Sequence, residues 1–239
     1  MKKFSQLAFP YIIWCVLMLA LPMLLIAFYS ITENGNGIVD VAFTFDNYKK
    51  FFTDPDFLLI LWRSIKIAIE TTIVCILIGY PVAYFIANSS DKMRNILVLM
   101  ITLPMWINML VRTYAWIGIL SDGGIAQRIL EFLGLGTHQL LYTEGAVMLG
   151  MVYNFMILQI NTALSKMDKS LIEASADLGA NKFQTFLRVI FPLSLPGVVS
   201  GISLVFLPCV SSFFIPKLLG GAQFFLIGNV IETQFITVG

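Results

Sequence analysis

The chain has 239 residues, of which 58% are hydrophobic and 12% charged, and its mean hydropathy is +0.86. This composition excludes an ordinary soluble domain and indicates an all-α integral membrane protein. The net charge of +1, without any basic cluster, gives no reason to expect a nucleic-acid partner.

Five apolar segments are long enough to cross about 30 Å of hydrocarbon as helices. They are predicted at about residues 7–31, 58–87, 96–120, 145–164 and 195–214. The first is too long for a signal-peptide core and lacks a small-residue cleavage site, so it is expected to remain as a span. Pro81 and Pro208 are expected to kink the second and fifth spans, and Pro104 lies inside the third. We divide the chain into residues 1–57, with the first span and a polar loop, and a core of residues 58–239.

Neither a disulfide nor a metal site is predicted. Cys15, Cys75 and Cys209 lie in apolar segments without CxxC spacing, and His138 is the single histidine. No cofactor is expected in this chain, because it contains no GxxxxGK[ST] phosphate loop and no GxSxG or HExxH motif. The chain is therefore not expected to be an enzyme or to hydrolyse ATP itself.

The loops differ in charge. The N-terminus, the turn at residues 88–95 and the loop at 166–194 together hold eight basic and four acidic residues. The other loops, including one at 121–144 with an expected surface helix at 125–133, hold eight acidic and three basic residues. The positive-inside rule therefore predicts that the N-terminus and the loop at 166–194 are cytoplasmic.

The polar stretch KMDKSLIEASADLGANKFQTFLRVIFPLSLP, which begins at Lys166, predicts two short helices. Ser170 and Glu173 have the spacing of a capping box, so the first helix should begin at Ser170. Gly179 should end it in a left-handed turn. Asn181 is a possible cap for the second helix, and Pro192 is expected to stop it. By these features alone, a docking element and a plain connecting loop are equally compatible.

The same stretch resembles the EAA loop of binding-protein-dependent ABC importer permeases. Glu173, Ala174, Ser175, Gly179 and Pro192 have the family's spacing, with Ser175 in place of the second alanine, Val189 in place of isoleucine and Phe191 in place of leucine. The resemblance implies that the residues which couple to the ATPase are Glu173, Ala174, Ser175, Asp177, Gly179 and Pro192. The resemblance implies a type I importer permease fold and a coupling helix that docks on a cytoplasmic ATPase dimer, which would bind ATP and Mg²⁺. It also implies a paralogous permease subunit, an extracytoplasmic substrate-binding protein, and a sixth span beyond the five that are predicted.

The segment PMWINMLVRTYAW, from Pro104 to Trp116, contains Asn108, Arg112 and Trp116 at helical spacing. An arginine within a span normally faces a cavity or a carboxylate, although Arg112 could equally lie among the outer headgroups. The segment is similar to one found in the B-type permeases of spermidine/putrescine importers. The tail, with Pro216–Gly221 and Leu226–Asn229, is similar to the same branch.

That resemblance implies a polyamine substrate, and a polycation pathway needs few carboxylates together with aromatic faces. The candidate pathway residues are Glu70, Trp106, Asn108, Arg112, Tyr114, Trp116, Tyr153, Asn154, Asn161 and Glu232. Two alternatives stay open: Glu70 could simply pair with Lys66, and the tryptophans could be lipid-interface anchors.

The substrate and the transport class also have alternatives. Related importers with similar segments carry 2-aminoethylphosphonate or metal ions. An ion channel would need a self-contained pore, and the docking loop argues against it; uptake that requires ATP and the other subunits would separate the two.

Overall fold

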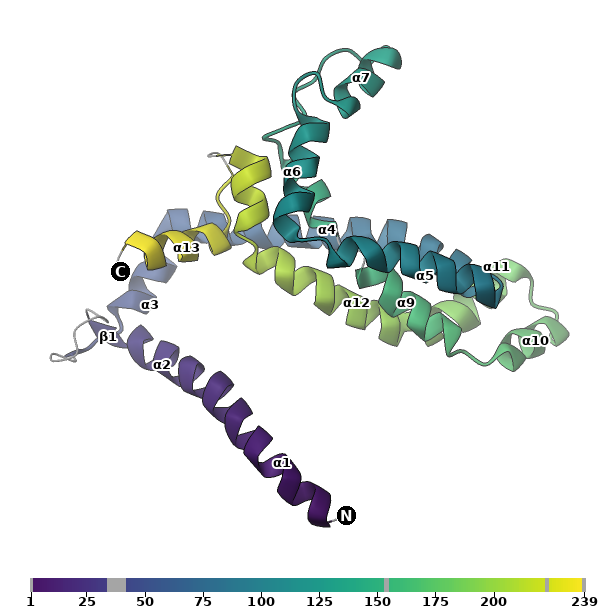
Figure 1. Ribbon diagram of the computed structural model, residues 1–239, viewed down its shortest axis with the longest axis horizontal. Coiled ribbons are helices and arrows are strands. Elements are labelled where there is room, and N and C mark those ends of the chain that lie inside the picture. Colours follow the sequence, from purple (N-terminus) through teal and green to yellow (C-terminus); the bar gives the residue numbers. More distant parts are fainter. Residues whose placement is uncertain (1, 34–41, 153–154, 222–223, 238–239) are drawn as a thin grey trace. The chain divides into compact units, whose positions relative to one another are not determined.

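A computed structural model of the chain describes residues 2–33, 42–152, 155–221 and 224–237. These residues are mostly helical (Figure 1), which confirms the all-α prediction. The chain forms two compact units, Met1–Leu59 and Ile60–Gly239.

The N-terminal unit consists of a long apolar helix followed by a small polar cap. Its elements are α1 (Lys2–Cys15), the π-helical turn η1 (Val16–Ala20), α2 (Leu21–Ser30), β1 (Thr32–Glu33), β2 (Ala42–Phe43) and α3 (Asp46–Thr53). The two strands are antiparallel, with Thr32 opposite Phe43. The Asn47 amide donates to the carbonyls of Ser30 and Thr32, at 3.1 and 3.0 Å, which holds α3 against the end of α2.

The second unit contains the remaining helices. They are α4 (Pro55–Ala87, which begins just before this unit), α5 (Asp91–Trp106), α6 (Met109–Leu120), α7 (Ile125–Phe132), α8 (Glu144–Met151), α9 (Phe155–Ser165), α10 (Lys169–Asp177), α11 (Lys182–Thr185), the π-helical turn η2 (Phe186–Ile190), α12 (Phe191–Ser211), the π-helical turn η3 (Pro216–Gly220) and α13 (Ile227–Thr237). The surface helix expected at 125–133 corresponds to α7.

Among the residues that the structure describes, three helices are long and apolar enough to cross a membrane: Phe9–Ser30, Pro55–Ala87 and Lys182–Ser211. Two bent pairs, formed by residues 91–132 and 144–165, bring the number to five if each pair is one span. The third span, predicted at about residues 96–120 with Pro104 inside it, is not one continuous helix. The chain is extended at Ile107 and Asn108, and the helices on either side of this break differ in direction by 95°.

The core of the second unit is built on the contact between α9 and α12, which lie side by side (Figure 1). Gly197 and Gly201 of α12 allow this approach. A Cβ atom at Gly197 would lie 2.5 Å from the Ala163 Cβ and 2.8 Å from the Gln159 carbonyl oxygen. A Cβ atom at Gly201 would lie 2.5 Å from the Met156 sulfur. Small residues at such a seam let two helices pack closely. This matters in lipid, where the hydrophobic effect does not drive helices together.

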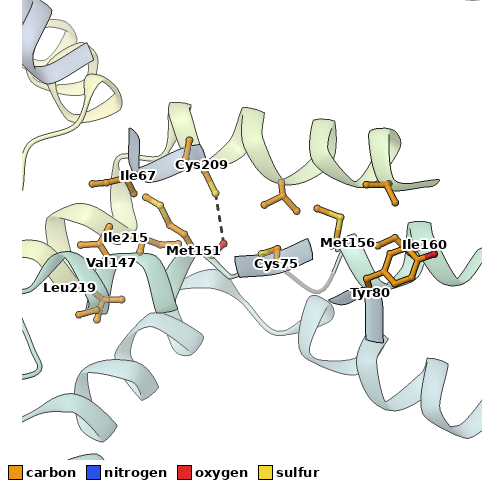
Figure 2. Packing of buried hydrophobic residues seen from close by; sticks show 14 of the residues in the cluster. Ile67, Cys75, Tyr80, Val147, Met151, Met156, Ile160, Cys209, Ile215 and Leu219 are labelled. Atoms are coloured by element: carbon orange, nitrogen blue, oxygen red, sulfur yellow. Dashed lines mark hydrogen bonds between the residues drawn. The ribbon is translucent and has the colours of Figure 1, made fainter. Parts of the chain in front are cut away.

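Around this seam, aliphatic and sulfur-containing side chains from α4, α8, α9 and α12 form one cluster (Figure 2). Cys75 and Cys209 are buried within it as free thiols, and the Cys209 thiol donates to the Met151 carbonyl at 3.8 Å. Both cysteines therefore contribute as small buried side chains of the core.

Candidate functional site

The first helix of the docking loop (residues 166–194) is α10, and its start differs from the prediction. Asp168, not Ser170, is the N-cap, and its carboxylate accepts from the Ser170 backbone N–H at 2.9 Å. This hydrogen bond holds the pKa of the Asp168 carboxyl below its ordinary value. Asp168 is therefore ionised at neutral pH, where its charge also complements the positive end of the helix.

The end of α10 agrees with the prediction. Gly179 has φ of +79°, the left-handed conformation that glycine adopts without a steric penalty. The Ala180 N–H donates to the Ser175 carbonyl, and the Gly179 N–H donates to the Ala176 carbonyl, at 3.1 and 2.9 Å. These two bonds are the Schellman arrangement, so Gly179 fixes the angle at which the chain leaves the helix.

The second helix begins as predicted but does not end where expected. Asn181 and Gln184 form a reciprocal capping box at the start of α11. Pro192 does not stop the helix, because Lys182–Ser211 is one continuous helix. The wider turn η2, in which the Phe191 N–H donates to the Phe186 carbonyl, comes directly before Pro192. Proline in the first turn of α12 is tolerated there because it removes a donor at a change of hydrogen-bond register.

A buried hydroxyl pair joins the two helices of the docking loop. The Ser175 and Thr185 hydroxyl oxygens lie 2.9 Å apart, and the two residues are 8% and 7% exposed. Ser175 is the residue that departs from the E-A-A pattern. Its hydroxyl thus has a specific partner at the start of the helix that leads into the membrane.

The outer surface of α10 is available for contact with another protein. Glu173, Ala174 and Asp177 are exposed, and Leu178 beside the turn is 88% exposed. Glu173 also lines a cavity of about 380 Å³ between α10 and the α4–α5 turn, together with Arg94. The exposed surface here therefore combines two carboxylates with the large apolar side chain of Leu178.

The predicted pathway residues on α5 and α6 surround the break between these helices. Trp106 ends α5 and is 82% exposed, and Asn108 is the N-cap of α6, accepting from the Leu110 N–H at 2.8 Å. On α6, Tyr114 is exposed, Arg112 is half-buried and Trp116 packs against the core. The structure therefore gives the two tryptophans different environments.

The two acidic pathway candidates each contact a lysine. Glu70 lies 3.6 Å from the Lys66 ammonium, which in turn is 2.9 Å from Glu144 of α8. Glu70 therefore does pair with Lys66, and Glu144 is the nearer partner of that lysine. Glu232 lies 3.0 Å from Lys217 and lines a cavity of about 280 Å³ that Phe224 and Phe225 also border.

The remaining candidates lie on or near α9. Asn161 is buried and accepts a hydrogen bond from the Ser165 hydroxyl at 3.4 Å, so its side chain faces other helices of this chain. Tyr153 and Asn154 lie outside the described residues. Of the described residues that line the cavity at Glu232, none besides Glu232 is a predicted pathway residue.

Sequence reasoning missed the partners Thr185, Glu144 and Lys217. Each meets its counterpart across a loop or between two helices, where helical periodicity gives no signal. The Asn229 amide was also missed as an anchor. It donates to the Phe213 carbonyl at 2.6 Å and accepts from the Leu226 N–H at 3.2 Å, holding the start of α13 to the end of α12.

Broken and continuous apolar helices, with a two-helix polar loop between them, are the arrangement expected of a membrane permease subunit. Residues 75–238 match the family described as "Binding-protein-dependent transport system inner membrane component", and the chain belongs to this family. This confirms the class that the docking loop indicated and places the protein in the inner membrane.

Several curated relatives match most of the chain. A protein named "Spermidine/putrescine transport system permease protein PotB" from Salmonella typhimurium (strain LT2) is 38% identical over 99% of this chain and 85% of its own length. The protein of the same name from Escherichia coli (strain K12) is 38% identical over 94% of this chain and 84% of its own length. "Inner membrane ABC transporter permease protein YdcU" from the same organism is 33% identical over 82% and 67%.

A solved structure supports the fold. A chain of a bacterial ABC transporter involved in the import of the acidic polysaccharide alginate superposes with a TM-score of 0.67. The match covers 99% of this chain and 85% of that one, at 19% sequence identity. At this identity the likeness concerns the fold, which is that of ABC importer permeases.

Proposed function

We propose that this chain is a permease subunit of an ATP-driven importer for polyamines, and that it forms half of the translocation pathway. The observation that carries the coupling part is the docking loop, in which Asp168, Gly179 and Asn181 fix the ends of two helices and leave Glu173 and Leu178 exposed. The polyamine part rests on the relatives whose names specify spermidine and putrescine.

The proposal assigns the energy source to other subunits. A cytoplasmic ATPase dimer with ATP and Mg²⁺ would contact α10 around Glu173, Ala174 and Asp177. A paralogous permease would complete the pathway, and an extracytoplasmic binding protein would deliver the substrate. The excess of basic residues at the N-terminus and in the docking loop supports a cytoplasmic position for both.

The pathway residues belong to the proposal as well. A polyamine ammonium over an aromatic face would gain about 0.5–2 kcal/mol. Exposed Trp106 and Tyr114, on the two sides of the α5–α6 break, are positioned to offer such faces. Glu70 and Glu232 would draw ammonium groups only in exchange for Lys66 and Lys217, which keeps binding weak enough for release.

The test is uptake into liposomes that contain the complete complex, with the binding protein added outside. Labelled spermidine should accumulate only with ATP inside, and unlabelled putrescine should compete with it. Competition by 2-aminoethylphosphonate or by divalent metal ions, with no effect of putrescine, would assign the chain to a related importer. Solute flux through this chain alone, without ATP, would indicate a channel.

A further inference from the structure

The hydroxyl pair in the docking loop has a defined direction. The Ser175 hydroxyl donates to the Ile172 carbonyl at 2.9 Å, which uses its single hydrogen. The Thr185 hydroxyl must therefore be the donor in the bond between the two residues, and Ser175 the acceptor. The bond lies out of water, so replacing the acceptor would leave a buried donor without its partner.

Thr185 is also connected to two membrane helices. It is the last residue of α11, within the continuous helix Lys182–Ser211 that includes α12. The next residue, Phe186, packs edge-on against the rings of Tyr80 and Tyr84 from α4, with centroid distances of 5.7 and 5.8 Å. A displacement of α11 is therefore expected to displace both α12, which belongs to the same continuous helix, and α4, which contacts Phe186.

We propose that the hydrogen bond from Thr185 to Ser175 positions α10 on the helix Lys182–Ser211, so that a displacement of α10 moves α12 and α4 with it. Thr185 is in this sense a positioning residue for coupling, although it need not touch the ATPase. The inference rests on the proposed function, because it concerns how a docking helix transmits motion.

The hydrogen bond from Thr185 to Ser175 accounts for the serine at position 175, where the E-A-A pattern has alanine. Alanine at position 175 could not accept the Thr185 hydroxyl, so the serine and the threonine are expected to work as a pair. Changing Ser175 to alanine alone should therefore leave a buried donor unpaired and lower recovery of the complex, whereas removing both hydroxyls should restore recovery and leave only the looser attachment of α10.

The experiment compares Ser175→Ala, Thr185→Val, Thr185→Ser and the double variant Ser175→Ala/Thr185→Val in the reconstituted complex. Ser89→Ala and Thr162→Val are matched controls, because each of these hydroxyls donates to the carbonyl four residues earlier in the chain. Spermidine uptake is divided by ATP hydrolysed in the same vesicles, and backbone hydrogen exchange is followed over residues 169–180.

Spermidine moved per ATP should fall about two- to tenfold in the double variant, as expected for one net hydrogen bond. Exchange in α10 should accelerate by a similar factor, while recovery of the complex matches the controls. Thr185→Ser keeps the hydroxyl donor, so spermidine moved per ATP and hydrogen exchange in α10 should both stay at the wild-type values. Ser175→Ala should also lower recovery of the complex.

Wild-type coupling and exchange in the double variant would overturn the inference, because apolar contact would then suffice. Equal defects in the control variants would overturn it too. If wild-type vesicles take up no spermidine, the proposed substrate fails, and hydrogen exchange in α10 still decides whether the link exists.

Discussion

Tyr80 of α4 and Ser194 of α12 share a buried hydrogen bond of 2.8 Å between their hydroxyl oxygens, although 114 residues separate them in the chain. Ser194 donates its hydrogen to the Phe191 carbonyl at 2.8 Å, so Tyr80 is the donor in the shared bond. The bond joins the second span to the helix that continues from the docking loop.

The two partners should therefore respond differently to substitution. Tyr80→Phe removes the donor and should lower the free energy of unfolding by about 0.5–1.5 kcal/mol. Ser194→Ala leaves the buried tyrosine hydroxyl unpaired and should cost about 1–3 kcal/mol. Denaturation of the purified protein in detergent measures both, with Ser203→Ala on the exposed side of α12 as the control. A smaller loss for Ser194→Ala than for Tyr80→Phe would contradict the assigned direction.

Gly179 should tolerate neither alanine nor proline. Alanine in the left-handed conformation costs roughly 1–2 kcal/mol, and proline is restricted to φ near −65°, so Gly179→Pro destroys the turn. We expect Gly179→Pro to insert in the membrane but to lose assembly with the ATPase or stimulation of ATP hydrolysis by substrate. Gly118→Ala is the control, since its new Cβ would meet no atom within 4 Å. Wild-type transport by Gly179→Pro would refute the docking assignment.

Gly197→Ala should destabilise the seam between α9 and α12. The new Cβ would lie 2.8 Å from the Gln159 carbonyl oxygen, and a backbone atom cannot turn aside as a side chain can. Overpacking of this kind costs about 1–3 kcal/mol. The midpoint of thermal unfolding in detergent should fall for Gly197→Ala and not for Gly118→Ala. Equal midpoints would mean that the helices separate easily at this position.

Cysteine labelling tests the membrane orientation. In a background without Cys15, Cys75 and Cys209, single cysteines replace Lys50 in α3 and Lys182 in α11, both of which are exposed. A membrane-impermeant maleimide added to intact cells should label the cysteine at position 50, and the cysteine at 182 should react only after the cells are opened. Labelling of both from outside would overturn the cytoplasmic docking loop.

Replacing Trp106, at the end of α5, by alanine should slow polyamine uptake. Trp106→Ala removes an exposed ring, and loss of about 0.5–2 kcal/mol of cation–π attraction corresponds to roughly a 2- to 30-fold slower uptake. Trp106→Phe keeps an aromatic face and should be milder. Uptake is compared at equal amounts of assembled complex. If Trp106→Ala takes up spermidine normally, the ring is a lipid anchor.

Local signals accounted for much of the architecture. Hydropathy located the apolar segments, and the residue types at Gly179 and Asn181 predicted their turn and cap. Two caps compete in the stretch before α10, and the sequence could not show that Asp168 would prevail over Ser170. The break at Ile107 and Asn108 was missed because the apolar run that contains Pro104 was assigned to one span, although an asparagine before an apolar run is also a cap signal.

Contacts between distant residues could not be predicted in this way. The pairs Lys66–Glu144 and Ser175–Thr185 depend on how separate helices meet, and no spacing in one sequence encodes that. The same holds for the pathway residues, whose grouping depends on surfaces that a partner subunit would complete.

The helix from Lys182 to Ser211 is uninterrupted. The direction in which its docking-loop side chains point is therefore fixed relative to that of its side chains within the membrane. Each residue of an α-helix turns the chain by about 100°, so adding or removing one residue within Phe186–Ile190 would rotate Thr185 by that angle relative to α12. The π-helical turn at these positions already contains one residue more than an α-helical turn would use. This extra residue therefore sets the rotation about the helix axis at which Thr185 contacts Ser175 while Gly197 and Gly201 face α9.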